Sequence, residues 1–202
     1  MNKSIEFLNE YCTFDNPEEV WMLKGVSRSK DNKEGFHRFM RRLVIVKPDD
    51  IEACYNDIKL MGSHKDTEYR MYISLNSRNV IKGMFQFQKK LLDISHGVAR
   101  GLEDMKLQTT KLASVWKTEL EQNGCRGTKR FLLDVDSQDK LLLDRVLKNI
   151  GSRIHVVRPT VSGYAVVIDA CDMRDFYKEF KGEPIDVQKD SMVFVEKWTG
   201  NA

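Results

Sequence analysis

Apolar and polar positions along this chain switch between a period of two residues and a period near 3.6. Alternation predicts a half-buried strand over 69–75, and short apolar runs predict further strands over 20–23, 38–46, 131–136, 153–157, 164–168 and 192–195. Helical spacing predicts a short helix near the N-terminus and further helices after Pro48, over 139–150 and near 173–180. The order of these elements predicts two β-α-β units.

The segment from about 79 to 122 has a different composition. It is rich in Lys, Leu, Met and Gln, and its glycines interrupt it only weakly. Its apolar positions mostly fit a helical stripe, so we expect two or three inserted helices. No repeat or obvious linker divides the chain. The pattern therefore predicts a single domain over 1–202, of the α+β class, with a mixed sheet of six or seven strands and a helical insertion at about 79–122.

Composition narrows the class of protein only a little. The chain has 202 residues, 41% of them hydrophobic and 31% charged, which is ordinary for a soluble globular protein. The net charge of +3 permits an anionic partner without requiring one. No stretch approaches the roughly 18 apolar residues of a membrane span, and the N-terminus lacks a leader-like apolar region, so we expect a soluble, cytoplasmic protein with no membrane partner.

Several common activities lose their usual support. The four cysteines form no Cys-x-x-Cys pair, and the four histidines show no metal-binding spacing, which argues against a zinc site. The phosphate-binding loop of ATPases, the dinucleotide-binding glycine pattern and the nucleophile elbow of hydrolases are all absent from the sequence.

The most informative motif is Asp134-Val135-Asp136, at the end of an apolar run. Side chains alternate across a strand, so the two carboxylates point to the same face and can together hold a divalent metal ion. Oxygen ligands of this kind suit Mg²⁺ or Mn²⁺. The alternative is structural, since Asp136-Ser137 is well placed to cap the helix that starts near Asp139.

Candidate phosphate-binding groups follow the motif. The turn and strand after the next helix bring a cation, hydroxyl groups and a glycine, namely Arg158, Thr160, Ser162, Gly163 and Tyr164. Further arginines at or near strand ends could clamp phosphate in a bidentate way, namely Arg41, Arg42, Arg70 and Arg78. For any one of these arginines the alternative is a surface ion pair.

An apolar strand ending in Asp-x-Asp, then a helix, then a strand carrying Thr-x-Ser-Gly-x resembles the core of the archaeo-eukaryotic primase superfamily, the primase-polymerase fold. The resemblance covers roughly 40–196 in layout and is specific only over 131–169. It implies an RRM-like core in which Asp134 and Asp136 are the catalytic metal ligands, holding Mg²⁺ or Mn²⁺. It also implies that Ser162 and Gly163 approach an incoming nucleoside triphosphate.

The resemblance implies a later acidic residue that completes the metal site, for which the sequence offers Asp169, Asp172, Asp190 and Glu196. The small size is similar to phage or plasmid members of the superfamily, whose role is in DNA replication. The sequence departs from the family at Tyr164, where the family has a histidine, and tyrosine cannot carry a positive charge near neutral pH.

Two functions therefore remain open. The first is a primase-polymerase-like nucleotidyltransferase that uses a nucleoside triphosphate, a nucleic acid and a divalent metal. The second is a non-catalytic nucleotide-binding, nucleic-acid-binding or protein-interaction module on the same fold. The intact Asp-x-Asp favours the first function and Tyr164 favours the second. The sequence indicates no oligomeric state.

Overall fold

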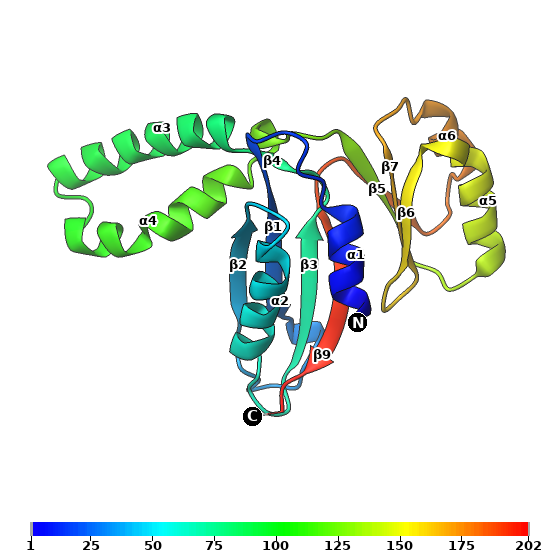
Figure 1. Cartoon of the computed structure of the whole chain (residues 1–202), viewed down its shortest axis with the longest axis horizontal. Helices are drawn as coiled ribbons and strands as arrows, with labels where there is room; N and C mark the ends of the chain where they lie inside the picture. Colours follow the sequence, from blue (N-terminus) through cyan, green and yellow to red (C-terminus); the bar gives the residue numbers. More distant parts are fainter. Residues whose placement is uncertain (1, 202) are drawn as a thin grey trace.

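The computed structural model describes residues 2–201, and within them the strands form two antiparallel sheets (Figure 1). The first sheet has the strand order β2-β1-β3-β9, with bounds β1 (Glu19–Ser27), β2 (Met40–Ile45), β3 (Glu68–Ser74) and β9 (Met192–Thr199). A two-residue strand, β4 (Arg78–Asn79), pairs with the start of β1.

One face of the first sheet is apolar. It carries Trp21, Leu23 and Met71, which are fully buried against two helices, α1 (Lys3–Tyr11) and α2 (Asp50–Met61). The alternate positions of the same strands, such as Lys24 on β1 and Tyr72 on β3, point to the opposite face. The sheet therefore has one face that builds the core and one that is available for polar side chains.

The second sheet has the strand order β6-β7-β5-β8, with bounds β5 (Arg130–Val135), β6 (Ile154–Pro159), β7 (Tyr164–Asp169) and β8 (Ile185–Gln188). With its helices, α5 (Lys140–Ile150) and α6 (Arg174–Glu179), the chain order is β-α-β-β-α-β, the split β-α-β arrangement. Both helices cover one face, where Leu133 and Val135 of β5 pack with Val146 and Phe176. The other face contributes Leu132 to the core of the first sheet.

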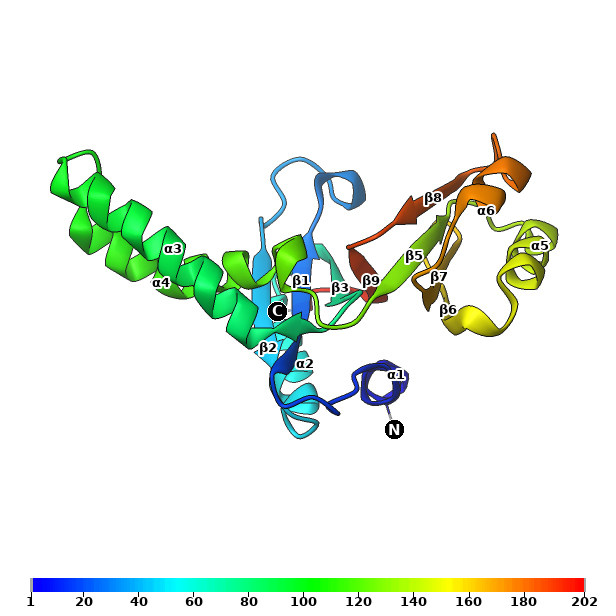
Figure 2. The same cartoon turned by 90° about the horizontal axis from the view of Figure 1, so that it is seen from above.

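The predicted helical segment is a hairpin of two helices, α3 (Val80–Ala99) and α4 (Met105–Leu120). It projects from the first sheet on the side away from the second sheet (Figures 1 and 2). At its base, Leu120 packs with Val20 and Met22 of β1. Gly83 lets the helices approach closely, because a Cβ at this position would lie 2.7 Å from Leu120 Cδ1.

The α+β class is confirmed, but the expectation of one mixed sheet is wrong. The two predicted β-α-β units are present, but each is split by a third strand. In the first unit, β1 lies between β2 and β3 and pairs antiparallel with both. In the second unit, β7 lies between β5 and β6 in the same way. Local patterns show which segments are strands, but not which strands become neighbours.

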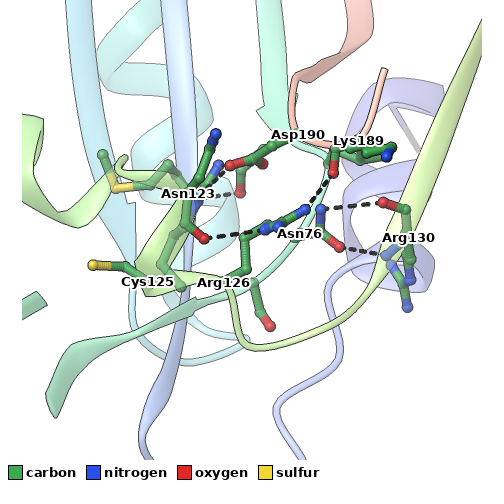
Figure 3. A network of polar contacts seen from close by, with 12 residues as sticks. Asn76, Asn123, Cys125, Arg126, Arg130, Lys189 and Asp190 are labelled. Carbon is green, nitrogen blue, oxygen red and sulfur yellow. Dashed lines mark hydrogen bonds and ion pairs between the residues drawn. The ribbon is translucent and has the colours of Figure 1, made fainter. Parts of the chain in front are cut away.

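A polar network joins the two sheets (Figure 3). Arg78 makes a bidentate ion pair with Asp190 at 2.8 and 2.9 Å, and both side chains are almost fully buried. Arg126 donates to the backbone carbonyl of Lys189 at 2.7 Å. The Asn76 side chain donates to the Arg130 carbonyl and accepts from the Arg130 N–H. These contacts hold the start of β5 and the link between β8 and β9 in place. Among residues 2–201, no helix combines the length and apolar character needed to cross a membrane.

Candidate functional site

A cleft of about 550 Å³ opens between the free face of the first sheet and the second sheet. The second sheet and its β6–β7 turn contribute carboxyl and hydroxyl groups to the wall, namely Asp134, Asp136, Thr160 and Ser162. The first sheet and the loop after β1 contribute cations and aromatic rings, namely Lys24, Arg28, Lys30, Arg70, Tyr72 and Phe194. The two walls thus carry opposite charge.

The acidic wall is built by strand alternation and register. Asp134 and Asp136 both line the cleft, while Val135 between them is buried under the helices. Asp186 on β8 is the cross-strand partner of Asp134, so its side chain shares that face. Burial raises the pKa of Asp134, the charges of Asp136 and Asp186 raise it further, and Lys30 lowers it. The positive charge of Lys30, on the other wall, thus acts on Asp134 across the cleft.

Asp136 does not cap the following helix, so the capping alternative is wrong for this residue. The N-cap of α5 is Asp139, whose carboxylate accepts from the Leu141 backbone N–H at 2.9 Å. Ser137 supports the same turn through its hydroxyl oxygen, which accepts from the Asp139 N–H. The carboxylate of Asp136 instead accepts a hydrogen bond from the Ser162 hydroxyl at 2.9 Å.

The β6–β7 turn brings Ser162 to that position. The turn is closed by the Thr160 N–H bonding the Gly163 carbonyl, and by the Thr160 hydroxyl accepting from the Gly163 N–H. Gly163 lies so close to β5 that a Cβ would come within 2.0 Å of the Val135 carbonyl oxygen. Only glycine permits this approach. Gly163 therefore lets the turn lie close enough to β5 for the Ser162 hydroxyl to reach Asp136.

The basic wall contains both paired and unpaired cations. Arg70 forms a buried ion pair with Asp31, and Arg28 donates to the Tyr72 hydroxyl at 3.2 Å. Lys24 and Lys30 have no hydrogen-bond or ion-pair partner among residues 2–201. Two ammonium groups are therefore free to bind an anion in the cleft.

The loop that carries Lys30 is fastened to the first sheet. The Asn32 side chain donates to the carbonyls of Arg28 and Glu68, both at 2.9 Å, and accepts from the Glu68 N–H. The Asp31–Arg70 pair holds the same loop to β3. Lys30 is thus an exposed side chain on an anchored backbone.

The structure leaves several predicted contacts outside the cleft. Arg158 donates to the Val195 carbonyl at 2.6 Å and lies over the Phe7 ring. Tyr164 packs with the core beneath α5 and α6, on the face of the sheet opposite Asp134. The remaining arginines also lie elsewhere: Arg42 pairs with Glu121, Arg78 with Asp190, and Arg41 does not line the cleft.

The four acidic residues suggested for completing the site are each engaged elsewhere. Their partners are His155 for Asp169, Arg174 for Asp172, Arg78 for Asp190 and Lys59 for Glu196. Asp186, which sequence reasoning missed, is the acid that shares a face with Asp134. Its only signal was the short alternation Ile185-Asp186-Val187. Lys24 and Lys30 were also missed, and alternation of Lys24, Val26 and Arg28 along β1 was the available signal for the first.

The donor set fits a metal ion that arrives with phosphate better than a bare ion. Within residues 2–201, no group of three or more His, Cys, Asp or Glu side chains is gathered closely enough to hold a metal by itself. Magnesium is commonly held by one or two carboxylates together with substrate phosphates and water. Asp134 and Asp136 meet that smaller requirement.

Comparisons with protein-family models, with curated proteins and with solved structures find no match to this chain. The indication of function therefore comes from the cleft itself. Its chemistry is that of carboxylates and ammonium groups that have no ion-pair partner among residues 2–201 and line a space large enough for a small molecule.

Proposed function

We propose that this chain is a primase-polymerase-like nucleotidyltransferase that binds a divalent metal ion with a nucleoside triphosphate in the cleft between its sheets. One observation carries the proposal. Asp134 and Asp136 face Lys24 and Lys30 across the cleft without pairing with them. A metal–triphosphate complex matches both walls, because its cation suits the carboxylates and its phosphate oxygens suit the ammonium groups.

Each wall has a distinct role in phosphoryl transfer. Asp134 and Asp136 would hold Mg²⁺ or Mn²⁺, which supplies neutralisation of the charge that develops on the transferring group. Lys24 and Lys30 would bind phosphate oxygens from the opposite side. The Ser162 hydroxyl fixes the orientation of Asp136 through its hydrogen bond. Asp186, beside Asp134 in register, would act through its charge rather than as a third ligand, because it does not line the cleft and its carboxylate accepts a hydrogen bond from the Gln188 side chain.

Two features support a primase-polymerase core in particular. The second sheet has the split β-α-β order that suits an RRM-like core, and Asp-x-Asp stands at the end of its first strand. The turn with Thr160, Ser162 and Gly163 lies directly beside it. Tyr72 and Phe194 add aromatic surface against which a nucleobase can stack.

A second candidate function has its own support. The family position of histidine is Tyr164, which faces the core under α5 and α6, and none of the described residues that line the cleft is a histidine. A module that binds nucleotide or nucleic acid without transferring phosphoryl groups would retain the two charged walls and dispense with that histidine. The two functions differ in whether nucleotide is incorporated into a strand.

Calorimetric titration with a nucleoside triphosphate, with and without Mg²⁺ or Mn²⁺, tests the proposal. We expect metal-dependent binding in the unaltered protein and its loss in Asp134→Asn/Asp136→Asn, because the metal ligands are removed. The matched control is Asp144→Asn/Asp175→Asn, which removes two exposed carboxylates from α5 and α6, on the far side of the second sheet. This control should bind like the unaltered protein.

The outcomes separate the candidates. Binding that needs metal and Asp134/Asp136, followed by nucleotide incorporation in a primer-extension assay, supports the nucleotidyltransferase. Binding without incorporation supports the non-catalytic module. Absence of triphosphate binding under all metal conditions would overturn the proposal.

A further inference from the structure

One face of α4 is mostly basic and polar, with Leu107 as the large apolar side chain on that side. Between 105 and 118 the chain contains three lysines and no aspartate or glutamate. At helical spacing, the lysines and three hydroxyl side chains fall on one side of the helix, namely Lys106, Thr110, Lys111, Ser114, Lys117 and Thr118. We call these six residues the α4 basic face.

Contacts with β2 fix the direction of this face. The Arg42 guanidinium donates to the hydroxyls of Ser114 and Thr118 at 3.3 and 3.1 Å, and Lys117 donates to the Arg42 carbonyl at 2.9 Å. The opposite side of α4 packs on α3, where the Trp116 ring meets Phe87. The α4 basic face is therefore turned toward the first sheet at its base, and its members farther along, Lys106, Thr110 and Lys111, are exposed. The hairpin that carries them projects away from the sheets (Figure 2).

The base of the hairpin has an excess of positive charge. Burial lowers the pKa of Lys117, and the charges of Arg41 and Arg42 lower it further. Glu121 pairs with Arg42. Arg41 and Lys117 have no carboxylate partner among the described residues. Crowded cations of this kind attract a polyanion.

The α4 basic face is continuous with the cleft. Arg42, which it contacts, is the cross-strand partner of Lys24, and Lys24 lines the cleft. Cross-strand partners share one face of a sheet, so the cations continue from the cleft across β1 and β2 to α4. The 16 residues of α4 extend about 24 Å, which matches about seven phosphates of a strand at about 3.4 Å each.

We propose that the α4 basic face binds the phosphate backbone of a nucleic-acid strand whose end reaches the cleft. The inference rests on the proposed function only in one respect, namely that the end of the bound strand takes part in nucleotidyl transfer in the cleft. Backbone binding itself needs lysines that neutralise phosphates, and it carries no sequence preference.

The composition of the face favours nucleic acid over an anionic membrane. A membrane-binding helix places large apolar side chains beside its lysines, to be buried among the lipids. Leu107 is the one large exposed apolar side chain on this side of α4, and the six members of the α4 basic face include none. The exposed apolar side chains of α3, Ile81, Phe85 and Leu92, belong to the other helix.

Fluorescence anisotropy with labelled single-stranded and duplex oligonucleotides of about 30 nucleotides, across a salt series, tests the inference. The test variant is Lys106→Gln/Lys111→Gln, since both side chains are exposed and make no hydrogen bond or ion pair within residues 2–201. We expect weaker binding, and a salt dependence shallower by about 1.4 for single strands or about 1.8 for duplex. The matched control is Lys89→Gln/Lys90→Gln on α3, which removes the same charge away from the face.

The outcomes are distinguishable from those of the triphosphate titration. Weakened binding in the α4 variant alone, with triphosphate affinity unchanged in both variants, supports the inference even where no metal-dependent chemistry is found. If both lysine variants weaken oligonucleotide binding equally, net charge alone explains the loss, and the inference is overturned. An unchanged α4 variant, or lysine-dependent binding to phosphatidylserine vesicles without oligonucleotide binding, would also overturn it.

Discussion

At the scale of single residues, Asp134 shows a conflict between stability and function. It is half-buried at the end of a strand, next to two other carboxylates, and these conditions disfavour its charged form. Its neighbours on the same strand are apolar and fully buried. The metal ion that we propose for the cleft would relieve this repulsion.

This conflict predicts the effect of Asp134→Asn on stability. Because the folded-state pKa is raised, the folded protein binds the proton more tightly than the unfolded chain does. Its contribution to stability is then present below the unfolded pKa of about 3.9 and is lost as the pH rises through the folded value. Without metal, the variant should therefore melt at a higher temperature than the unaltered protein near neutral pH, and the difference should shrink toward about pH 4.

Thermal unfolding followed by circular dichroism, with a chelator present, measures this difference. Asp144→Asn on the exposed side of α5 makes the same chemical change away from the cleft and should leave the melting temperature unchanged. A lower melting temperature for Asp134→Asn at neutral pH would show that the carboxylate stabilises the fold, contrary to our expectation.

At the scale of elements, the β6–β7 turn positions the site through contact with β5. A Gly163→Ala side chain would overlap the Val135 carbonyl, so the turn must move away and the Ser162–Asp136 hydrogen bond should break. Overpacking of this kind typically costs about 1–3 kcal/mol in the free energy of unfolding. Urea denaturation measures the cost.

Gly124→Ala is the control for this substitution. A Cβ at Gly124 meets nothing within 4 Å, and this glycine is not among those with positive φ. Its free energy of unfolding should change little. Equal stability of the two alanine variants would mean that the β6–β7 turn tolerates displacement, and the positioning role of Gly163 would be wrong.

Elements also set the limit of what local pattern can predict. The helices and most strands were predicted close to their positions, because amphipathic periodicity reports which face is buried, but β1 and β9 were each predicted as four residues and extend to Ser27 and Thr199. β8 was missed because four residues provide too few alternations to distinguish a strand from a loop. Asp186 was missed with it, since only the register of β8 on β5 brings this carboxylate to Asp134.

At the scale of the whole molecule, the Arg78–Asp190 pair joins the two sheets. Removing one partner of a buried ion pair leaves an uncompensated charge and typically costs about 3–5 kcal/mol. We therefore expect Arg78→Ala to lower the free energy of unfolding by about that amount. Ser191 and Met192 follow Asp190 and line the cleft, so triphosphate affinity should fall as well.

Chemical denaturation and calorimetric titration test the two parts of this prediction. Arg174→Ala is the matched control, because Arg174 pairs with Asp172 on the exposed surface near α6. Solvent screens such a pair, and its loss should leave unfolding nearly unchanged. If Arg78→Ala and Arg174→Ala are equally stable, the buried pair does not hold the sheets together.

The sequence by itself determined the α+β class, the helical segment near 79–122, the strand that bears Asp134 and Asp136, and their common face. These follow from interactions between residues close in the chain, which leave a periodic signal. Only the tertiary structure decided the division into two sheets and the partners of Arg42, Arg70, Arg78 and Arg158. It also decided that Lys24 and Lys30 face the acidic wall. These features depend on strand order and register between distant segments. The local sequence around an arginine or lysine is the same whether its side chain reaches a carboxylate, a carbonyl or an open cleft.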